Sequence, residues 1–179
     1  MALVGLGEVL SLLEERKVCL PAIDIGGGHP DFLLGMLRAC EETACPALLI
    51  VYAPMARYVG LEACAHLVRF FAQRSPVPVV LHLDHGTTED LVERAIELGF
   101  TSVMFDASSE PLDENIRRTK AMVELAQIEH GNHADIHPLA SEIMPGCETT
   151  LRISRMALAP IRSVRSANKC PKAILFSFF

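Results

Sequence analysis

The chain has 179 residues, half of them hydrophobic, and a formal net charge of −6. This length allows one domain with a sizeable core, and the absence of any tract of about 18 uncharged apolar residues argues against a membrane-spanning segment. The acidic balance argues against nucleic acid as the main partner, because binding to phosphates needs a basic face.

The beginning of the chain predicts an amphipathic helix and no signal peptide, because five charged side chains interrupt the apolar stretch between Met1 and Val18. The six cysteines form no C-x-x-C pair, and most of them lie within apolar segments, where a thiol packs as a small hydrophobic group. This cysteine usage favours a reducing compartment, so we expect a cytoplasmic protein with no membrane partner.

Short apolar runs alternate with helical patterns at a period of about 30 residues, which is typical of repeated βα units. Because parallel strands need crossover connections, this order predicts an α/β fold with a parallel sheet. The expected strand and helix pairs are Val18 to Ile25 with Pro30 to Thr43, Ala47 to Tyr52 with Leu61 to Gln73, Val79 to Leu83 with Thr88 to Leu98, and Ser102 to Phe105 with Leu112 to His130. A fifth strand is expected between Asn132 and Ile136.

Four to five such units fit either a doubly wound sheet or part of a TIM (β/α)8 barrel, since both folds are built from the βα unit. A full barrel typically needs about 250 residues, so these units would form about half of one. After Pro145 the alternation is lost, and from Gly146 onward six basic residues accompany one acidic residue. We therefore expect a partial barrel at residues 1–137 and an atypical, poorly ordered basic tail at 138–179.

The apolar run from Val79 to Leu83 ends in Asp84, His85 and Gly86. In parallel α/β folds, active sites lie at the carboxyl ends of the strands. An imidazole is a good Zn²⁺ ligand, and a neighbouring carboxylate can move a proton on a bound substrate. The alternative is a turn in which Asp84 accepts loop hydrogen bonds and Gly86 adopts a positive φ.

A second apolar run, from Phe100 to Phe105, is followed by Asp106 and Ser108. This repetition favours a site shared between neighbouring strands. Alternatively, Asp106 could cap the next helix. His82 is expected to pack within the sheet. Two further groups carry weaker signals. The glycines from Gly26 to Gly28 could cradle a phosphate or form a tight turn. The histidines around Asp135, which are His130, His133 and His137, could bind a metal, but their spacing fits solvated loop histidines better.

Three stretches of the chain closely resemble class II fructose- and tagatose-bisphosphate aldolases. They are Pro78 to Gly86, Ala95 to Ser108, and Pro111 to Lys120. The resemblance covers about Leu10 to His130. It implies a TIM barrel that uses Zn²⁺ to cleave fructose or tagatose 1,6-bisphosphate reversibly into dihydroxyacetone phosphate and glyceraldehyde 3-phosphate, a reaction of glycolysis.

The resemblance also implies roles for individual side chains. Asp84 would exchange the proton of the substrate's C4 hydroxyl, and His85 would be the first zinc ligand. Asp106 would help to hold a second cation or orient the site. Asp135 would replace a metal-linked glutamate that the family carries on its next strand.

The chain also departs from the family pattern. Asp24 stands where the family often has Asn after the first strand, and Tyr52 stands where Ser often ends the second. The His-Gly motifs that supply the remaining zinc ligands do not occur after Ile136, whereas a catalytic zinc normally takes three protein ligands.

These departures predict an inactive, truncated aldolase. Our hypothesis for the change from an acidic to a basic composition near Gly146 is an interrupted or shifted reading frame. The alternatives are a non-catalytic fragment of an aldolase, and another lyase or isomerase for phosphorylated sugars. Open sheet edges would favour a homo-oligomer or aggregation.

Overall fold

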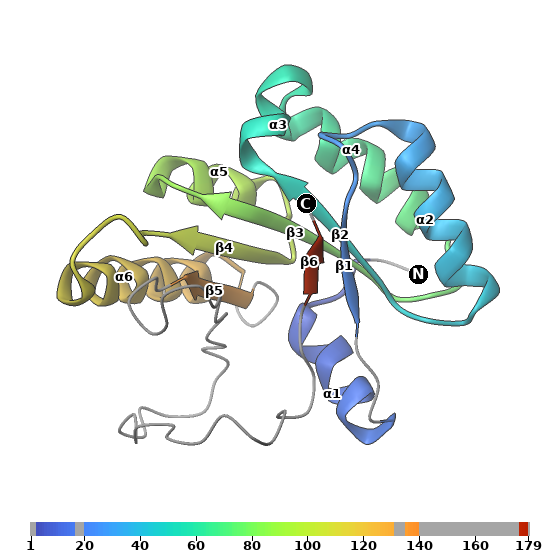
Figure 1. The fold of residues 1–179 in the computed structure, drawn as a ribbon, viewed down its shortest axis with the longest axis horizontal. Helices are drawn as coiled ribbons and strands as arrows, with labels where there is room; N and C mark the ends of the chain where they lie inside the picture. Colours follow the sequence, from blue (N-terminus) through green and yellow to red (C-terminus); the bar gives the residue numbers. More distant parts are fainter. Residues whose placement is uncertain (1–2, 17–19, 131–134, 140–175, 179) are drawn as a thin grey trace.

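The computed structural model describes residues 3–16, 20–130, 135–139 and 176–178. Within them, six parallel strands form one sheet, flanked by helices (Figure 1). The strands are β1 (Pro21–Asp24), β2 (Ala47–Tyr52), β3 (Val79–Gly86), β4 (Ser102–Asp106), β5 (Asp135–Leu139) and β6 (Phe176–Phe178). The helices are α1 (Leu6–Arg16), α2 (Pro30–Glu42), α3 (Ala53–Val59), α4 (Leu61–Ala72), α5 (Glu89–Glu97) and α6 (Leu112–His130).

The strand order is β5-β4-β3-β2-β1-β6, so the first five strands lie in the order in which they follow one another in the sequence. A doubly wound sheet reverses its strand order at a switch point, whereas a barrel adds each strand beside the previous one. The predicted parallel βα repeats are therefore confirmed, with the order of a barrel. Helix α3, which immediately follows β2, was not predicted.

The two faces of the sheet pack against different helices because successive side chains of a strand point to opposite sides. Along β2, Leu49 and Val51 join the cluster that includes α2 to α6, whereas Leu48 and Ile50 join the cluster that includes α1. Figure 1 shows α1 away from α2, α3, α4 and α5, across the sheet. On the α1 face, Val80 of β3 is apolar, and polar side chains follow it toward the carboxyl end of the strand.

Strand β6 comes from the far end of the chain and pairs with β1 on the side opposite β2. Its three residues belong to the segment that we expected to be a poorly ordered tail, and β5 extends across the expected boundary at residue 137. Pairing with β6 satisfies hydrogen-bonding groups of β1 that would otherwise form a sheet edge. Apart from 138–139 and 176–178, the predicted tail lies outside the described residues. None of the described helices is long and apolar enough to cross a membrane.

The carboxyl end of β3 approaches β4 and α5 so closely that only glycine fits at position 86. A Cβ atom on Gly86 would lie 2.7 Å from Val92 Cγ2 and 2.8 Å from the Met104 carbonyl oxygen. Both distances are shorter than a carbon atom tolerates, and the carbonyl belongs to the backbone of a central strand. Gly86 therefore sets how closely the end of β3 packs on its neighbours.

We predict that Gly86→Ala destabilises the fold by about 2 kcal/mol or more, because the added methyl group overpacks the core. The control is Gly35→Ala on the exposed surface of α2, where a Cβ atom meets nothing within 4 Å. That substitution should stabilise the helix by roughly 0.5–1 kcal/mol. Urea denaturation measures both free energies of unfolding, and equal effects of the two substitutions would contradict the packing argument.

Candidate functional site at the carboxyl ends of β3 and β4

An irregularity in the pairing of β3 with β4 lies at the predicted Asp84-His85 pair. Leu83 pairs with Val103 and Gly86 with Phe105, so three steps along β3 correspond to two along β4. His85 adopts φ 54°, a conformation that is costly for a residue with a Cβ atom. This bulge re-aims His85 toward β4, as bulges commonly do next to functional sites.

His85 and Asp106 form a short hydrogen bond across this bulge. His85 Nδ1 lies 2.6 Å from Asp106 Oδ2, and the side chains of the two residues are 22% and 12% exposed. Because an ionised carboxylate can only accept, Nδ1 carries the proton, and Nε2 is the acceptor atom of the neutral ring. A histidine that binds a metal is commonly oriented in this way, with its other nitrogen donating to a carboxylate.

The carboxyl group of Asp106 is held in its ionised form. The hydrogen bond from His85 is the largest cause, hydrogen bonds from Ser108 add to it, and burial opposes it, so that the pKa of Asp106 falls from 3.8 to about 2. The backbone N–H of Ser108 donates to Asp106 Oδ1 at 3.0 Å. Both carboxylate oxygens therefore accept hydrogen bonds, which suits a residue that orients an imidazole.

Asp84 lies beside this pair and is only 3% exposed. It is adjacent in register to Tyr52 at the end of β2. Two residues earlier on β3, His82 is 1% exposed and its Nδ1 lies 2.8 Å from Ser102 Oγ. His82 is thus packed within the sheet, as expected, and the neighbouring strands hold the main chain on either side of Asp84.

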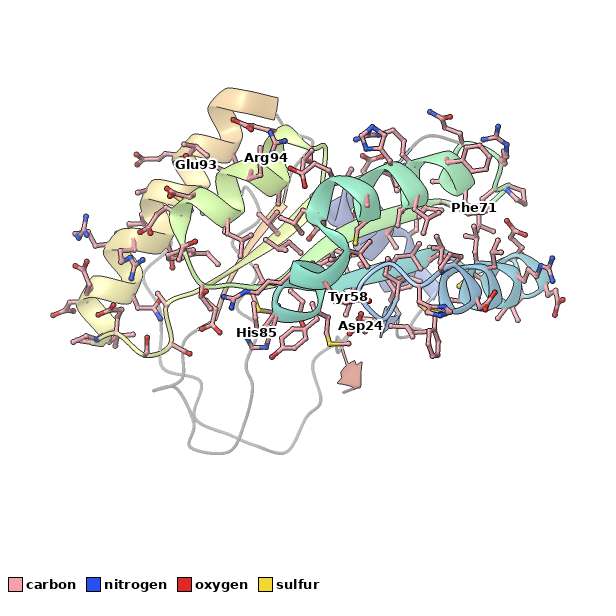
Figure 2. The ribbon with its side chains drawn as sticks, turned by 90° about the horizontal axis from the view of Figure 1, so that it is seen from above. Asp24, Tyr58, Phe71, His85, Glu93 and Arg94 are labelled. Atoms are coloured by element: carbon pink, nitrogen blue, oxygen red, sulfur yellow. The ribbon has the colours of Figure 1, made fainter. Side chains whose placement is uncertain are left out.

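The two positions that depart from the family pattern also lie at the carboxyl ends of strands. The ring of Tyr52 makes an edge-on contact with the ring of His85, with 5.8 Å between the centroids and 84° between the planes. Asp24 Oδ1 accepts a hydrogen bond of 2.8 Å from the backbone N–H of Gly26. Figure 2 shows His85 and Asp24 along the same edge of the molecule. From the sequence, Tyr52 was recognised as a departure from the family pattern, but its contact with His85 was not predicted. The available signal was that Tyr52 and His85 both lie at the carboxyl ends of neighbouring strands.

The glycine loop after β1 packs tightly against α3 and α4. A Cβ atom on Gly27 would lie 2.9 Å from the Met55 carbonyl oxygen, and one on Gly28 would lie 2.8 Å from Cys64 Sγ. Cys64 Sγ also donates to the Gly27 carbonyl oxygen at 3.2 Å. Close packing and positive φ angles explain these glycines, so the geometry supports the turn interpretation over the phosphate cradle.

The structure does not bring Asp135 to this edge of the sheet. Asp135 pairs with Ser102 at the beginning of β4, whereas Asp106, at the end of β4, pairs with Leu139. Asp135 and Asp106 therefore occupy opposite ends of their strands. Of the predicted histidine group, His133 lies outside the described residues, and His137 pairs with Met104 in the middle of β4.

The donor set at this edge fits one corner of a zinc site. His85 presents Nε2 as an acceptor, but the described part of the chain contains no group of three or more His, Cys, Asp or Glu side chains that could hold a metal ion. A catalytic zinc takes three protein ligands. Among the described residues, the site therefore consists of a buried carboxylate, an oriented imidazole and the carboxylate that orients it.

Comparison with known proteins adds independent findings. The family model described as fructose-bisphosphate aldolase class-II matches residues 4–131. The fructose-bisphosphate aldolase of Geobacillus stearothermophilus is 36% identical over 129 residues, which are 70% of this chain and 44% of that protein. The 6-phospho-5-dehydro-2-deoxy-D-gluconate aldolase of Bacillus licheniformis is 34% identical over 131 residues, or 72% and 44%.

Solved structures show the same likeness. The crystal structure of the YdjI aldolase from Escherichia coli K12 superposes with a TM-score of 0.63 at 26% identity, over 69% of this chain and 46% of that one. The chain therefore spans less than half the length of these relatives.

We predict a specific acid dependence of stability from the pKa of Asp106. Because that pKa is lower in the folded state, the stabilisation is present above about pH 4 and is lost as the pH falls toward 2; it amounts to about 2 kcal/mol. Asp106→Asn should remove this part of the pH dependence in urea denaturation experiments. Asp113→Asn, on the exposed surface of α6, is the matched control for the change of charge. Identical pH profiles for wild type and Asp106→Asn would contradict the assignment.

Proposed function

The chain belongs to the class II fructose-bisphosphate aldolase family, and from this premise we propose that the ends of β3 and β4 form the proton-transfer and metal-binding corner of a site for reversible aldol cleavage of a phosphorylated ketose. The observation that carries the proposal is the bulge in β3, which places buried Asp84 beside His85 while Asp106 orients the His85 ring. The proposed substrate is fructose or tagatose 1,6-bisphosphate.

In this proposal His85 Nε2 is one ligand of the Zn²⁺ on which the family depends. When bound, Zn²⁺ supplies Lewis-acid polarisation of the substrate's ketone. Asp106 holds the His85 ring and keeps its proton on Nδ1, which leaves Nε2 to face the metal. We assign Asp106 to this orienting role because its Oδ2 accepts the short hydrogen bond from His85 and its Oδ1 accepts one from the backbone of Ser108. Asp135, at the opposite end of the sheet, is not part of the proposed site.

Asp84 is the proposed acid and base. In the cleavage direction its carboxylate accepts the proton of the C4 hydroxyl while the bond between C3 and C4 breaks. C4 becomes the aldehyde carbon, and C3 keeps the electron pair and then takes up a proton from solvent to give dihydroxyacetone phosphate. In the reverse direction Asp84 returns the proton to the oxygen on C4. The proposed products are glyceraldehyde 3-phosphate and dihydroxyacetone phosphate, and the proposed role is in cytoplasmic carbohydrate metabolism. Low solvent exposure suits this exchange, because a nearly buried carboxylate reacts with a bound hydroxyl rather than with bulk water.

A second candidate, a non-catalytic member of the family, is favoured by the donor set. The described residues offer one oriented imidazole where three zinc ligands are needed. A different phosphorylated substrate is a variant of the first candidate. The Tyr52 ring contacts the ring of His85, and the relative from Bacillus licheniformis, at 34% identity, is named as a 6-phospho-5-dehydro-2-deoxy-D-gluconate aldolase.

For the chain as it stands, we predict weak zinc binding and no measurable cleavage of either bisphosphate. Isothermal titration calorimetry with zinc and an assay for the released triose phosphates measure the two properties. His85→Ala should weaken the residual zinc binding further, whereas His66→Ala on the exposed surface of α4 should leave it unchanged. Stoichiometric zinc together with turnover would contradict this prediction and would place the missing ligands outside the described residues.

The role of Asp84 can be tested in a complete aldolase. We predict that residues 4–131 of this chain, exchanged for the matching segment of the Geobacillus stearothermophilus aldolase, yield an enzyme that binds zinc and cleaves fructose 1,6-bisphosphate. In that enzyme Asp84→Asn should lower kcat by about 10²–10⁴-fold with unchanged zinc content, because the amide cannot accept the proton. Asp113→Asn is the control. A chimera that binds zinc and keeps its kcat after Asp84→Asn would refute the assignment.

A further inference from the structure

Helix α2 ends in a backbone motif that brings two cysteines together. The backbone N–H of Ala44 donates to the Glu41 carbonyl oxygen at 3.2 Å, and that of Cys45 donates to the Cys40 carbonyl oxygen at 2.9 Å. Ala44 has φ 53°, in the left-handed region. These are the two hydrogen bonds and the left-handed residue of a Schellman motif, in which the first and last side chains, here Cys40 and Cys45, commonly contact one another.

This geometry brings the two cysteines within reach of a disulfide. The two Cα atoms are linked through the backbone N of Cys45, its hydrogen bond of 2.9 Å and the carbonyl group of Cys40, and these lengths keep them within about 7 Å of each other. Disulfides span about 4.4–6.8 Å between Cα atoms. Cys45 Sγ donates to the Thr43 carbonyl oxygen at 3.6 Å, so rotation about its Cα–Cβ bond is needed to reach Cys40. Both residues are free cysteines.

The two thiols differ in solvent exposure, and this difference indicates which of them reacts first with an external disulfide. Cys45 is exposed, whereas Cys40 is partly buried. The pKa of the Cys40 thiol is raised by burial first and then by the nearby Cys45 and Glu41. Because the thiolate is the reactive form, the exposed Cys45 is the first to react with an external disulfide, and Cys40 reacts second.

We propose that Cys40 and Cys45 are a modification site, a dithiol that reacts with a low-molecular-weight disulfide such as glutathione disulfide and closes to an intramolecular disulfide. The Cys45 thiolate attacks one sulfur of glutathione disulfide, and one glutathione thiolate leaves. The Cys40 thiolate then attacks Cys45 Sγ in the mixed disulfide, and a second glutathione thiolate leaves. The two protein thiols are oxidised, glutathione disulfide is reduced, and the two protons go to solvent or to the released thiolates.

The bond would join the last turn of α2 to the residues just before β2, next to the hydrogen bond of 2.7 Å from Ser75 Oγ to Glu41 Oε1. Cys64 does not take part, because it is buried and its thiol donates to the loop after β1. This proposal is independent of the proposed aldolase function.

The test is oxidation of the full chain by glutathione disulfide followed by trypsin digestion and mass spectrometry. Residues 39–57 contain both cysteines and no internal Lys or Arg, so one tryptic peptide reports on both. We expect this peptide to lose two hydrogen atoms and to retain no glutathione. Cys40→Ser should instead accumulate glutathione on Cys45, because the second thiol is absent.

Folding should favour the internal bond. The folded chain should reach half-oxidation at a concentration of glutathione disulfide at least about tenfold lower, at fixed glutathione, than the chain unfolded in urea. Equal midpoints in the two states would overturn the proposal. It would also be overturned if the wild-type peptide kept glutathione on Cys45 to the same extent as the Cys40→Ser variant, or if both thiols of the folded chain stayed reduced while the unfolded chain was oxidised.

Discussion

The hydrogen bond between His85 and Asp106 across the bulge in β3 is the interaction on which the rest of the site depends. It requires His85 to hold a left-handed φ, Gly86 to lack a Cβ atom, and Asp106 to stay ionised. A left-handed non-glycine residue costs of order 1–2 kcal/mol, and a charge-assisted hydrogen bond contributes a similar amount. The strain and the hydrogen bond therefore offset each other, and the imidazole is fixed with Nε2 as its acceptor atom. Removing either partner would leave the strained backbone at His85 without this compensating hydrogen bond.

The sheet divides its two faces between structure and chemistry. One face is apolar along its length and packs on α2 to α6. Among the described residues, the other face packs on α1 through Leu48, Ile50, Val80 and their neighbours. Polar side chains such as Asp84 follow toward the carboxyl ends of the strands. In barrel enzymes the amino ends serve stability and the carboxyl ends serve chemistry. The strand order and the likeness to aldolase structures agree with that division.

Local patterns made much of this fold predictable. The alternation of apolar runs and amphipathic stretches located β1 to β4 and their helices, and polar residues at two strand ends located the site, because parallel strands present their carboxyl ends at one edge. The features that local patterns did not reveal depend on partners distant in the chain. The bulge at His85 and the contact with Tyr52 need the register of three strands. The resemblance implied that Asp135 replaces a metal-linked glutamate, but the register of β5 places Asp135 at the other end of the sheet from Asp106. The pairing of β6 with β1 joins segments separated by more than a hundred residues, which no local pattern encodes.

The central claim is that Asp106 fixes the His85 ring so that Nε2 faces the metal. The most direct measurement is the ¹⁵N NMR spectrum of the imidazole side chains, recorded with and without Zn²⁺. The account predicts that the proton facing Asp106 is on Nδ1 of His85, and that the Zn²⁺-dependent shift appears on the Nε2 signal and is reduced in Asp106→Asn. A proton on Nε2 in the metal-free chain, or a Zn²⁺-dependent shift at Nδ1, would contradict it.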